Sequence, residues 1–263
     1  MNEDLLTLTD HLPEKAFIFL AILCRVSGCI LPLPGLGNSS SPQIVRAGLV
    51  VALSILLFPS CSSFFASLPD NTLGNPSAML VILAGEILCG LTLGWICRLI
   101  CFSLPVAMQI IATMVGLASV IQPDPELGAQ STALSRLGML CIGVLMFSPA
   151  LYALPLSALV GSYTHFPPGH IFPTNNAAEA ILRMTSENFL LACQMASPFI
   201  LIGTLWPAFL GLLNRFAPAM QVYSLGMPAQ MLSGIFLLSL FIRSILSRWN
   251  EAVSAALSAL PGL

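Results

Sequence analysis

The stretch "GLLNRFAP", residues 211–218, is a short polar break between two long apolar runs. Pro218 has a fixed φ and no backbone N–H, so a helix that reaches this point ends close to it. Because the break is too short for a long connection, the flanking segments must lie antiparallel. The sequence therefore predicts a tight helical hairpin with Asn214, Arg215 and Pro218 at its tip.

The composition indicates what surrounds these apolar segments. The 263 residues are 57% hydrophobic and only 8% charged, whereas a soluble domain carries about 25% charged residues. Several uncharged stretches are as long as the roughly 20 residues that cross a bilayer as a helix. They lie between Arg25 and Arg46, Arg46 and Asp70, Arg98 and Asp124, Glu187 and Arg215, and Arg215 and Arg243. We expect a protein that lies in a membrane, in contact with lipid, or inside a membrane-bound assembly. The net charge of −2 without a basic stripe argues against a nucleic-acid partner.

Twenty prolines and nineteen glycines divide the apolar sequence into segments. The segments predict an all-α integral membrane protein whose apolar helices, broken by Pro and Gly, lie in antiparallel hairpins. The expected helices are 16–33, 43–57, 77–104 ending at Pro105, 132–160 broken at Pro149 and Pro155, 177–213 interrupted at Pro198 and Pro207, and 219–246 interrupted at 226–228. Residues 106–121 continue the apolar sequence, and residues 165–176 are expected to lie outside the membrane.

One helix carries small residues at a regular spacing and a single carboxylate. In "AGEILCGLTLGW", residues 84–95, Gly90 and Gly94 lie on one helix face. Small residues at this spacing let two helix backbones approach closely in lipid. Glu86 should face protein or water, because its charge is costly among lipid tails. Two interpretations stay open for Glu86: a buried carboxyl that is hydrogen-bonded to a neighbouring helix, and a direct role in transport.

The stretch "IQPDPELGAQ", residues 121–130, ends the helical sequence in the middle of the chain. Pro123 and Pro125 flank Asp124, and no helix continues through this pattern. We expect a loop with two carboxylates, Asp124 and Glu126, between two apolar segments.

Motifs for catalysis are missing from the sequence. It has no H-E-x-x-H, no G-x-S-x-G and no P-loop lysine, and Lys15 is its one lysine. His165 and His170 lie in a proline-rich connection, which favours a solvated loop over a metal site. Cys97 and Cys101 share a helix face without a His or carboxylate nearby, which favours buried apolar residues. We predict that the chain is not an enzyme and needs no cofactor or metal, which leaves a transporter, a channel component or a structural membrane subunit.

Four segments, in their order and spacing, resemble the FliR family, which comprises flagellar biosynthetic proteins of the type III export gate and their virulence-secretion counterparts. The segments are residues 24–60, "EILCGLTLGW" at 86–95, "GLASVIQPDP" at 116–125 and "GLLNRFAPAMQVYSLGMP" at 211–228. The matching residues are Arg25, Pro34, Pro42, Arg46, Gly48, Pro59, Glu86, Gly90, Gly94, Gly116, Leu117, Asp124, Pro125, Asn214, Arg215, Pro218, Gly226 and Pro228.

The resemblance implies a subunit of a pore that exports unfolded flagellar proteins from the bacterial inner membrane, within the flagellar basal body. The implied partners are FliP-like and FliQ-like subunits, an FlhB-like switch protein and the exported proteins. A FliP-like part would span about 1–175 and a FliQ-like hairpin about 176–263. A central plug loop, 114–130, would close the pore. Its residues are Met114, Val115, Gly116, Leu117, Ser119, Val120, Ile121, Gln122, Asp124 and Pro125.

The sequence departs from the family pattern within this loop. The family's Gly-x-Gln-x-Gly is replaced by residues 112–116, "ATMVG", and the family's aromatic plug residues fall on Ser119 and Gln122. Three alternatives stay open: a gate subunit of a virulence injectisome, a secondary transporter of a small solute, and a structural scaffold. Against the transporter, the two halves show no inverted repeat, and the ionisable residues suited to ion coupling are nearly limited to Glu86 and Arg98.

Overall fold

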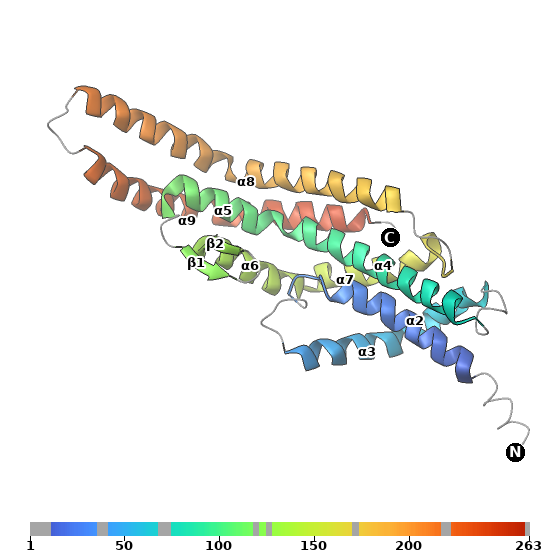
Figure 1. The fold of residues 1–263 in the computed structure, drawn as a ribbon. Coiled ribbons are helices and arrows are strands. Elements are labelled where there is room, and N and C mark those ends of the chain that lie inside the picture. Colours follow the sequence, from blue (N-terminus) through green and yellow to red (C-terminus); the bar gives the residue numbers. More distant parts are fainter. Residues whose placement is uncertain are drawn as a thin grey trace, which may run out of the picture. The chain divides into compact units, whose positions relative to one another are not determined.

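A computed structural model describes residues 12–35, 42–67, 75–117, 121–124, 128–169, 174–216 and 222–260. The described part is almost entirely helical, which confirms the predicted all-α membrane protein (Figure 1). The elements are α2 (Leu12–Ile30), α3 (Gln43–Cys61), the 3-10 helix η1 (Ser62–Ser67), α4 (Pro76–Cys101), α5 (Ser103–Val115), β1 (Ile121–Asp124), β2 (Gly128–Thr132), α6 (Ala133–Met146), α7 (Pro149–His165), α8 (Thr174–Phe216) and α9 (Val222–Ser258).

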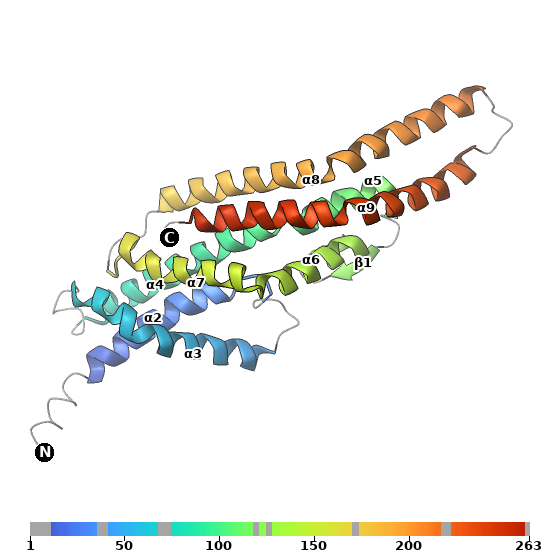
Figure 2. The ribbon, with the colours of Figure 1, turned by 180° about the vertical axis from the view of Figure 1, so that it is seen from behind.

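The chain forms two compact units that alternate along the sequence. The first comprises Met1–Arg98, Met146–Leu182 and Ala256–Leu263, and the second comprises Leu99–Leu145 and Arg183–Ala255. In the first unit, α2, α3, η1, most of α4 and α7 surround a core that includes Ile22, Val26 and Leu159. In the second unit, α5 and α6 pack together, and the parts of α8 and α9 that belong to it run side by side (Figures 1 and 2).

Within the described residues, four helical stretches are long and apolar enough to cross a membrane, and the bent pair of α6 and α7 makes a fifth if it counts as one span. They are Gln43–Phe65, Pro76–Val115, Ala178–Phe216 and Gly226–Ser258. Hydroxyl groups in these helices donate to carbonyls of their own helix, as Ser54 does to Val50 and Thr204 does to Ile200. This bonding satisfies polar groups that lipid cannot.

Several helices begin or end at other residues than predicted. The first predicted helix, 16–33, begins earlier and ends earlier, as Leu12–Ile30. Helix α3 continues past residue 57 to Cys61, with Pro59 in its last turn. The predicted helix 77–104 is α4, which ends at Cys101, and Pro105 lies in the first turn of α5 rather than after a helix. A first-turn proline is tolerated because its missing N–H would have no helical partner there.

The expected break at Pro149 is confirmed, whereas the breaks expected at four other prolines were wrong. The predicted helix 132–160 divides into α6, which ends at Met146, and α7, which begins at Pro149, because the fixed φ of proline suits the first helical position. Pro155 lies inside α7, Pro198 and Pro207 lie inside α8, and Pro228 lies inside α9. A proline removes one backbone hydrogen bond, which neighbouring groups in a membrane helix can compensate. Helix α8 extends beyond the predicted bounds 177–213 at both ends, to 174–216, and α9 extends past the predicted end at 246 to 258. The predicted start of the last helix, residues 219–221, lies outside the described residues.

The predicted loop at 121–130 contains regular structure. Residues 121–124 and 128–132 form antiparallel strands, with Ile121 opposite Thr132 and Asp124 opposite Gly128. The pairing is irregular between Gln122 and Asp124, where Pro123 has no N–H to donate to a ladder. The proline pattern excluded a helix correctly, but it did not exclude a short strand.

Candidate functional site

The centre of the first unit is an ion pair between α2 and α4. The Arg25 side chain donates through Nε to Glu86 Oε2 at 2.6 Å and through Nη2 to Glu86 Oε1 at 2.9 Å. The two residues are only 1% and 2% exposed. A bidentate geometry of this kind gives the strongest type of carboxylate–guanidinium hydrogen bonding. The Glu86 carboxylate is therefore held inside the protein by a residue of another helix.

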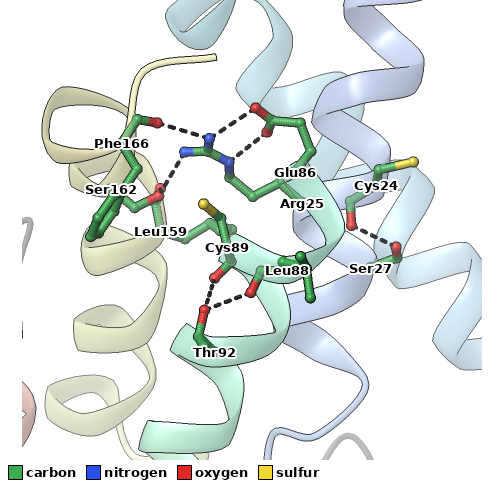
Figure 3. Close-up of polar contacts among 10 residues, drawn as sticks. All are labelled: Cys24, Arg25, Ser27, Glu86, Leu88, Cys89, Thr92, Leu159, Ser162 and Phe166. Carbon is green, nitrogen blue, oxygen red and sulfur yellow. Dashed lines mark hydrogen bonds and ion pairs between the residues drawn. The ribbon is translucent and has the colours of Figure 1, made fainter. Parts of the chain in front are cut away.

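Helix α7 completes the shell around the guanidinium (Figure 3). Nη1 donates to Ser162 Oγ at 3.2 Å, and Nη2 also donates to the Phe166 carbonyl at 2.9 Å. The Arg25 Cζ atom lies 3.8 Å from the centroid of the Tyr163 ring, which is a cation–π distance. The residue thus joins α2, α4 and the C-terminal end of α7, and we name Arg25, Glu86, Ser162 and Tyr163 the buried clamp.

Small residues bring α2 and α4 into backbone contact beside the clamp. A Cβ at Gly90 would overlap the Arg25 carbonyl, and one at Gly94 would overlap the Cys29 carbonyl. From the other helix, a Cβ at Gly28 would lie 2.8 Å from the Ile87 carbonyl. The glycine face predicted on α4 therefore lies against a helix of the same chain.

The second unit holds the start of the predicted plug loop. Helix α5 ends at Val115, and Gly116 follows with φ of 87°, a left-handed conformation that glycine adopts without strain. The Gln230 side chain of α9 donates to the Met114 carbonyl at 2.8 Å. The chain therefore leaves α5 at a point that α9 contacts.

The end of the loop is attached to α5. Gln109 Oε1 accepts hydrogen bonds from the backbone N and the hydroxyl of Thr132, at 3.1 and 2.9 Å. Ser135 Oγ donates to the Pro105 carbonyl at 3.1 Å. These bonds join the second strand and the start of α6 to α5.

Helices α8 and α9 form a long antiparallel hairpin within the second unit (Figure 2). Trp206 Nε1 donates to the Gly226 carbonyl at 3.1 Å, and farther from the tip the rings of Phe199 and Phe241 meet edge to face at 6.4 Å. The partners lie farther apart in sequence as the distance from the tip grows, as a hairpin requires. Asn214 and Arg215 lie in the last turn of α8, and Pro218 lies outside the described residues.

The hairpin exposes large apolar side chains. They include Leu201, Leu205, Phe209, Leu212, Phe216, Leu232, Phe236 and Leu240. On a soluble protein, exposed apolar residues are usually scattered singly and do not form an apolar surface of this extent. It has to be covered by lipid or by other protein chains.

The structure places the predicted plug residues only in part. Met114, Val115, Gly116 and Leu117 lie at the end of α5 and just after it. Ile121, Gln122 and Asp124 lie in β1. Ser119, Val120, Pro125 and Glu126 lie outside the described residues.

Sequence reasoning missed several site residues. Arg25 was identified only as a matching position and not as the partner of Glu86, and the other members not selected are Ser162, Tyr163, Gln109 and Gln230. A pair of opposite charges in neighbouring apolar segments is a signal that could have found the first, because intramembrane charges are expected to pair. No group of three or more His, Cys, Asp or Glu residues that could hold a metal occurs in the described part.

Comparisons with known proteins place this arrangement in a family. The profile of a family described as "Bacterial export proteins, family 1" matches residues 16–256. The flagellar biosynthetic protein FliR of Caulobacter vibrioides is 28% identical over 241 residues, which cover 90% of this chain and 93% of that protein. FliR of Escherichia coli is 30% identical over 220 residues, covering 82% of this chain and 81% of that protein.

A translocation protein is similar over a comparable length. The Yop proteins translocation protein T of Yersinia pestis is 25% identical over 249 residues, which cover 94% of both chains. The match to the family profile extends from the first described helix, α2, almost to the end of the last one, α9. The chain therefore belongs to the FliR family of bacterial export proteins.

Proposed function

We propose that the chain is a subunit of a type III protein export gate, and that it serves flagellum assembly in the bacterial inner membrane. The observation that carries the proposal is similarity to FliR proteins over nearly the whole chain. The uncovered apolar hairpin supports it, because a gate subunit packs against neighbours as well as lipid. The chain would act as part of a pore rather than as an enzyme.

The proposed partners are FliP-like and FliQ-like subunits, an FlhB-like switch protein and unfolded substrates. The proposed division is a FliP-like part at about 1–175 and a FliQ-like hairpin at about 176–263. The α8–α9 hairpin supports the second part, since its two long helices flank one short connection. The two compact units alternate along the chain and do not coincide with these two parts. The proposed division therefore describes which family each part resembles, and it does not describe parts that fold separately.

Loss and restoration of the gene test this function. Cells without it should stop exporting flagellar proteins, and the full chain with an affinity tag should restore export and recover FliP-like and FliQ-like proteins in detergent. Normal export without the gene would contradict the proposal. The similarity to translocation protein T favours testing a virulence injectisome as the second candidate; in that case, effector secretion and not flagellar export would be lost.

We also propose that residues 114–130 close the idle pore. Met114, Leu117, Val120 and Ile121 would form an apolar constriction, which excludes water better than polar groups do. Val115, whose side chain is buried at the end of α5, would fix the start of this segment. Deletion of 117–122 should raise the ion permeability of cells that contain the assembled gate. An assembled deletion variant that stays as tight as the wild type would contradict a role in closure.

A further inference from the structure

The last turn of α5 has a carbonyl that its own helix cannot satisfy. The final four carbonyls of an α-helix have no intrahelical donor. The Gly116 N–H donates to the Ala112 and Thr113 carbonyls, which caps part of this turn. The Met114 carbonyl receives its hydrogen bond from Gln230, which lies 116 residues later in the chain. A side chain of the hairpin therefore contributes to the cap of the helix that precedes the loop.

Two glycines of the hairpin let α5 approach this closely. A Cβ at Gly203 of α8 would lie 2.7 Å from Met114 Cβ and 2.8 Å from the Met114 carbonyl oxygen. A Cβ at Gly234 of α9 would overlap Val115 Cγ1. Gln230 and Gly234 are four residues apart and so share one face of α9. Both helices of the hairpin thus hold the same turn of α5.

The two ends of the loop are attached differently. At the return, Thr132 is held by Gln109, which belongs to α5 itself. At the end where the chain leaves α5, Met114 and Val115 contact Gly203, Gln230 and Gly234 of the hairpin. A displacement of the hairpin relative to α5 would therefore act first on this end of the loop.

We infer that Gln230, with Gly203 and Gly234, is the positioning device of the loop: it sets the direction in which the chain leaves α5 and couples that direction to the α8–α9 hairpin. The inference rests on the proposed function, in which the loop closes the pore. Neighbouring chains that cover the exposed hairpin would then bias the loop through continuous contacts. Gln230 acts through Met114 and does not itself line the closure.

Substitutions in the assembled gate test this inference. Gln230→Leu removes the donor at similar size, and Gly234→Ala adds the methyl group that Val115 cannot accommodate. The matched controls are Gln194→Leu, an exposed glutamine of α8, and Gly85→Ala, where no atom lies within 4 Å of the added Cβ. The measurements are the amount of assembled complex and the ion permeability of cells without export substrate. We expect permeability to rise several-fold for the two test variants at unchanged assembly, and to stay at the wild-type level for both controls.

Two further variants decide the result if Gln230→Leu lowers the amount of complex. Gln230→His keeps an N–H donor at a comparable reach, whereas Gln230→Asn keeps the amide but is one methylene shorter. The inference is supported if cells with the Gln230→His gate keep the wild-type ion permeability while cells with the Gln230→Asn gate leak. If the two variants have the same ion permeability, the inference is wrong.

The deletion of 117–122 separates the two proposals. If the deletion leaks while Gln230→Leu and Gly234→Ala stay tight, the loop closes the pore but the positioning by the hairpin is wrong. If the assembled deletion variant stays tight, the closure by the loop is wrong, and the positioning inference falls with it.

Discussion

The buried clamp and the α8–α9 hairpin differ in the kind of side chain they carry and in what those side chains contact. The clamp places an arginine and a glutamate inside the first unit, pairs them with each other across α2 and α4, and adds hydrogen bonds from the arginine to Ser162 and Phe166. The hairpin of the second unit has almost no charge between Glu187 and Arg243, and many of its large apolar side chains are exposed. The difference teaches that the charges of the clamp are satisfied by residues of their own unit, whereas the exposed apolar face of the hairpin needs surfaces that the chain does not supply.

The comparison is tested most strongly by breaking the clamp. Arg25→Leu leaves the Glu86 carboxylate buried without its partner, and removal of one member of such a pair costs about 3–5 kcal/mol. We expect a large fall in the thermal unfolding midpoint of the chain in detergent and in its amount in the membrane. The double variant Arg25→Leu/Glu86→Leu should recover much of the loss, since no unpaired charge remains. A double variant as unstable as Arg25→Leu would show that packing, and not charge pairing, holds the site.

A smaller loss is expected where α2 and α4 touch. Gly90→Ala forces a methyl group against the Arg25 carbonyl, and overpacking of this kind costs about 1–3 kcal/mol. Gly85→Ala on the same helix meets open space and should leave stability unchanged or raise it, because alanine favours a helix more than glycine does. Thermal unfolding of both variants in detergent measures the contrast. Equal effects of the two would refute the close approach.

A substitution on the exposed face of the hairpin should change the assembly with partner chains rather than the stability of the chain itself. Leu205 is 67% exposed, so Leu205→Asn should change the free energy of unfolding by no more than about 0.5 kcal/mol. If other chains cover this face, the recovery of FliP-like and FliQ-like proteins with the tagged variant should fall. Ser197→Asn, at an exposed polar position of α8, is the control. Undiminished recovery with Leu205→Asn would mean that lipid covers this position.

The smallest effect is expected for an ion pair on the surface. Arg183 Nε lies 2.9 Å from Glu187 Oε1, and their side chains are 73% and 52% exposed. Solvent screens such a pair, so Arg183→Ala should cost only about 0.3–0.5 kcal/mol. The unfolding midpoint should therefore stay close to that of the wild type. A loss as large as that of Arg25→Leu would remove the contrast between buried and exposed pairs.

Prolines were the main source of error in reading helices from sequence. Gly116 and Pro123 behave as local chemistry predicts, the first ending a helix and the second disturbing a strand. Pro198, Pro207 and Pro228 were expected to interrupt helices and do not. The local cost of a proline is known, but the neighbouring groups that offset it are supplied by the fold.

By itself, the sequence determined that this chain is a helical membrane protein with a hairpin near residue 218, because charge depletion and apolar run length depend only on composition and order. Only the tertiary structure decided which residues meet. Arg25 and Glu86 are 61 positions apart, and Met114 and Gln230 are 116 apart. Such pairs follow from how helices cross and which glycines let them approach. No periodicity within one segment contains that information, because hydrophobic patterning specifies a face of a helix and not the residue that covers it.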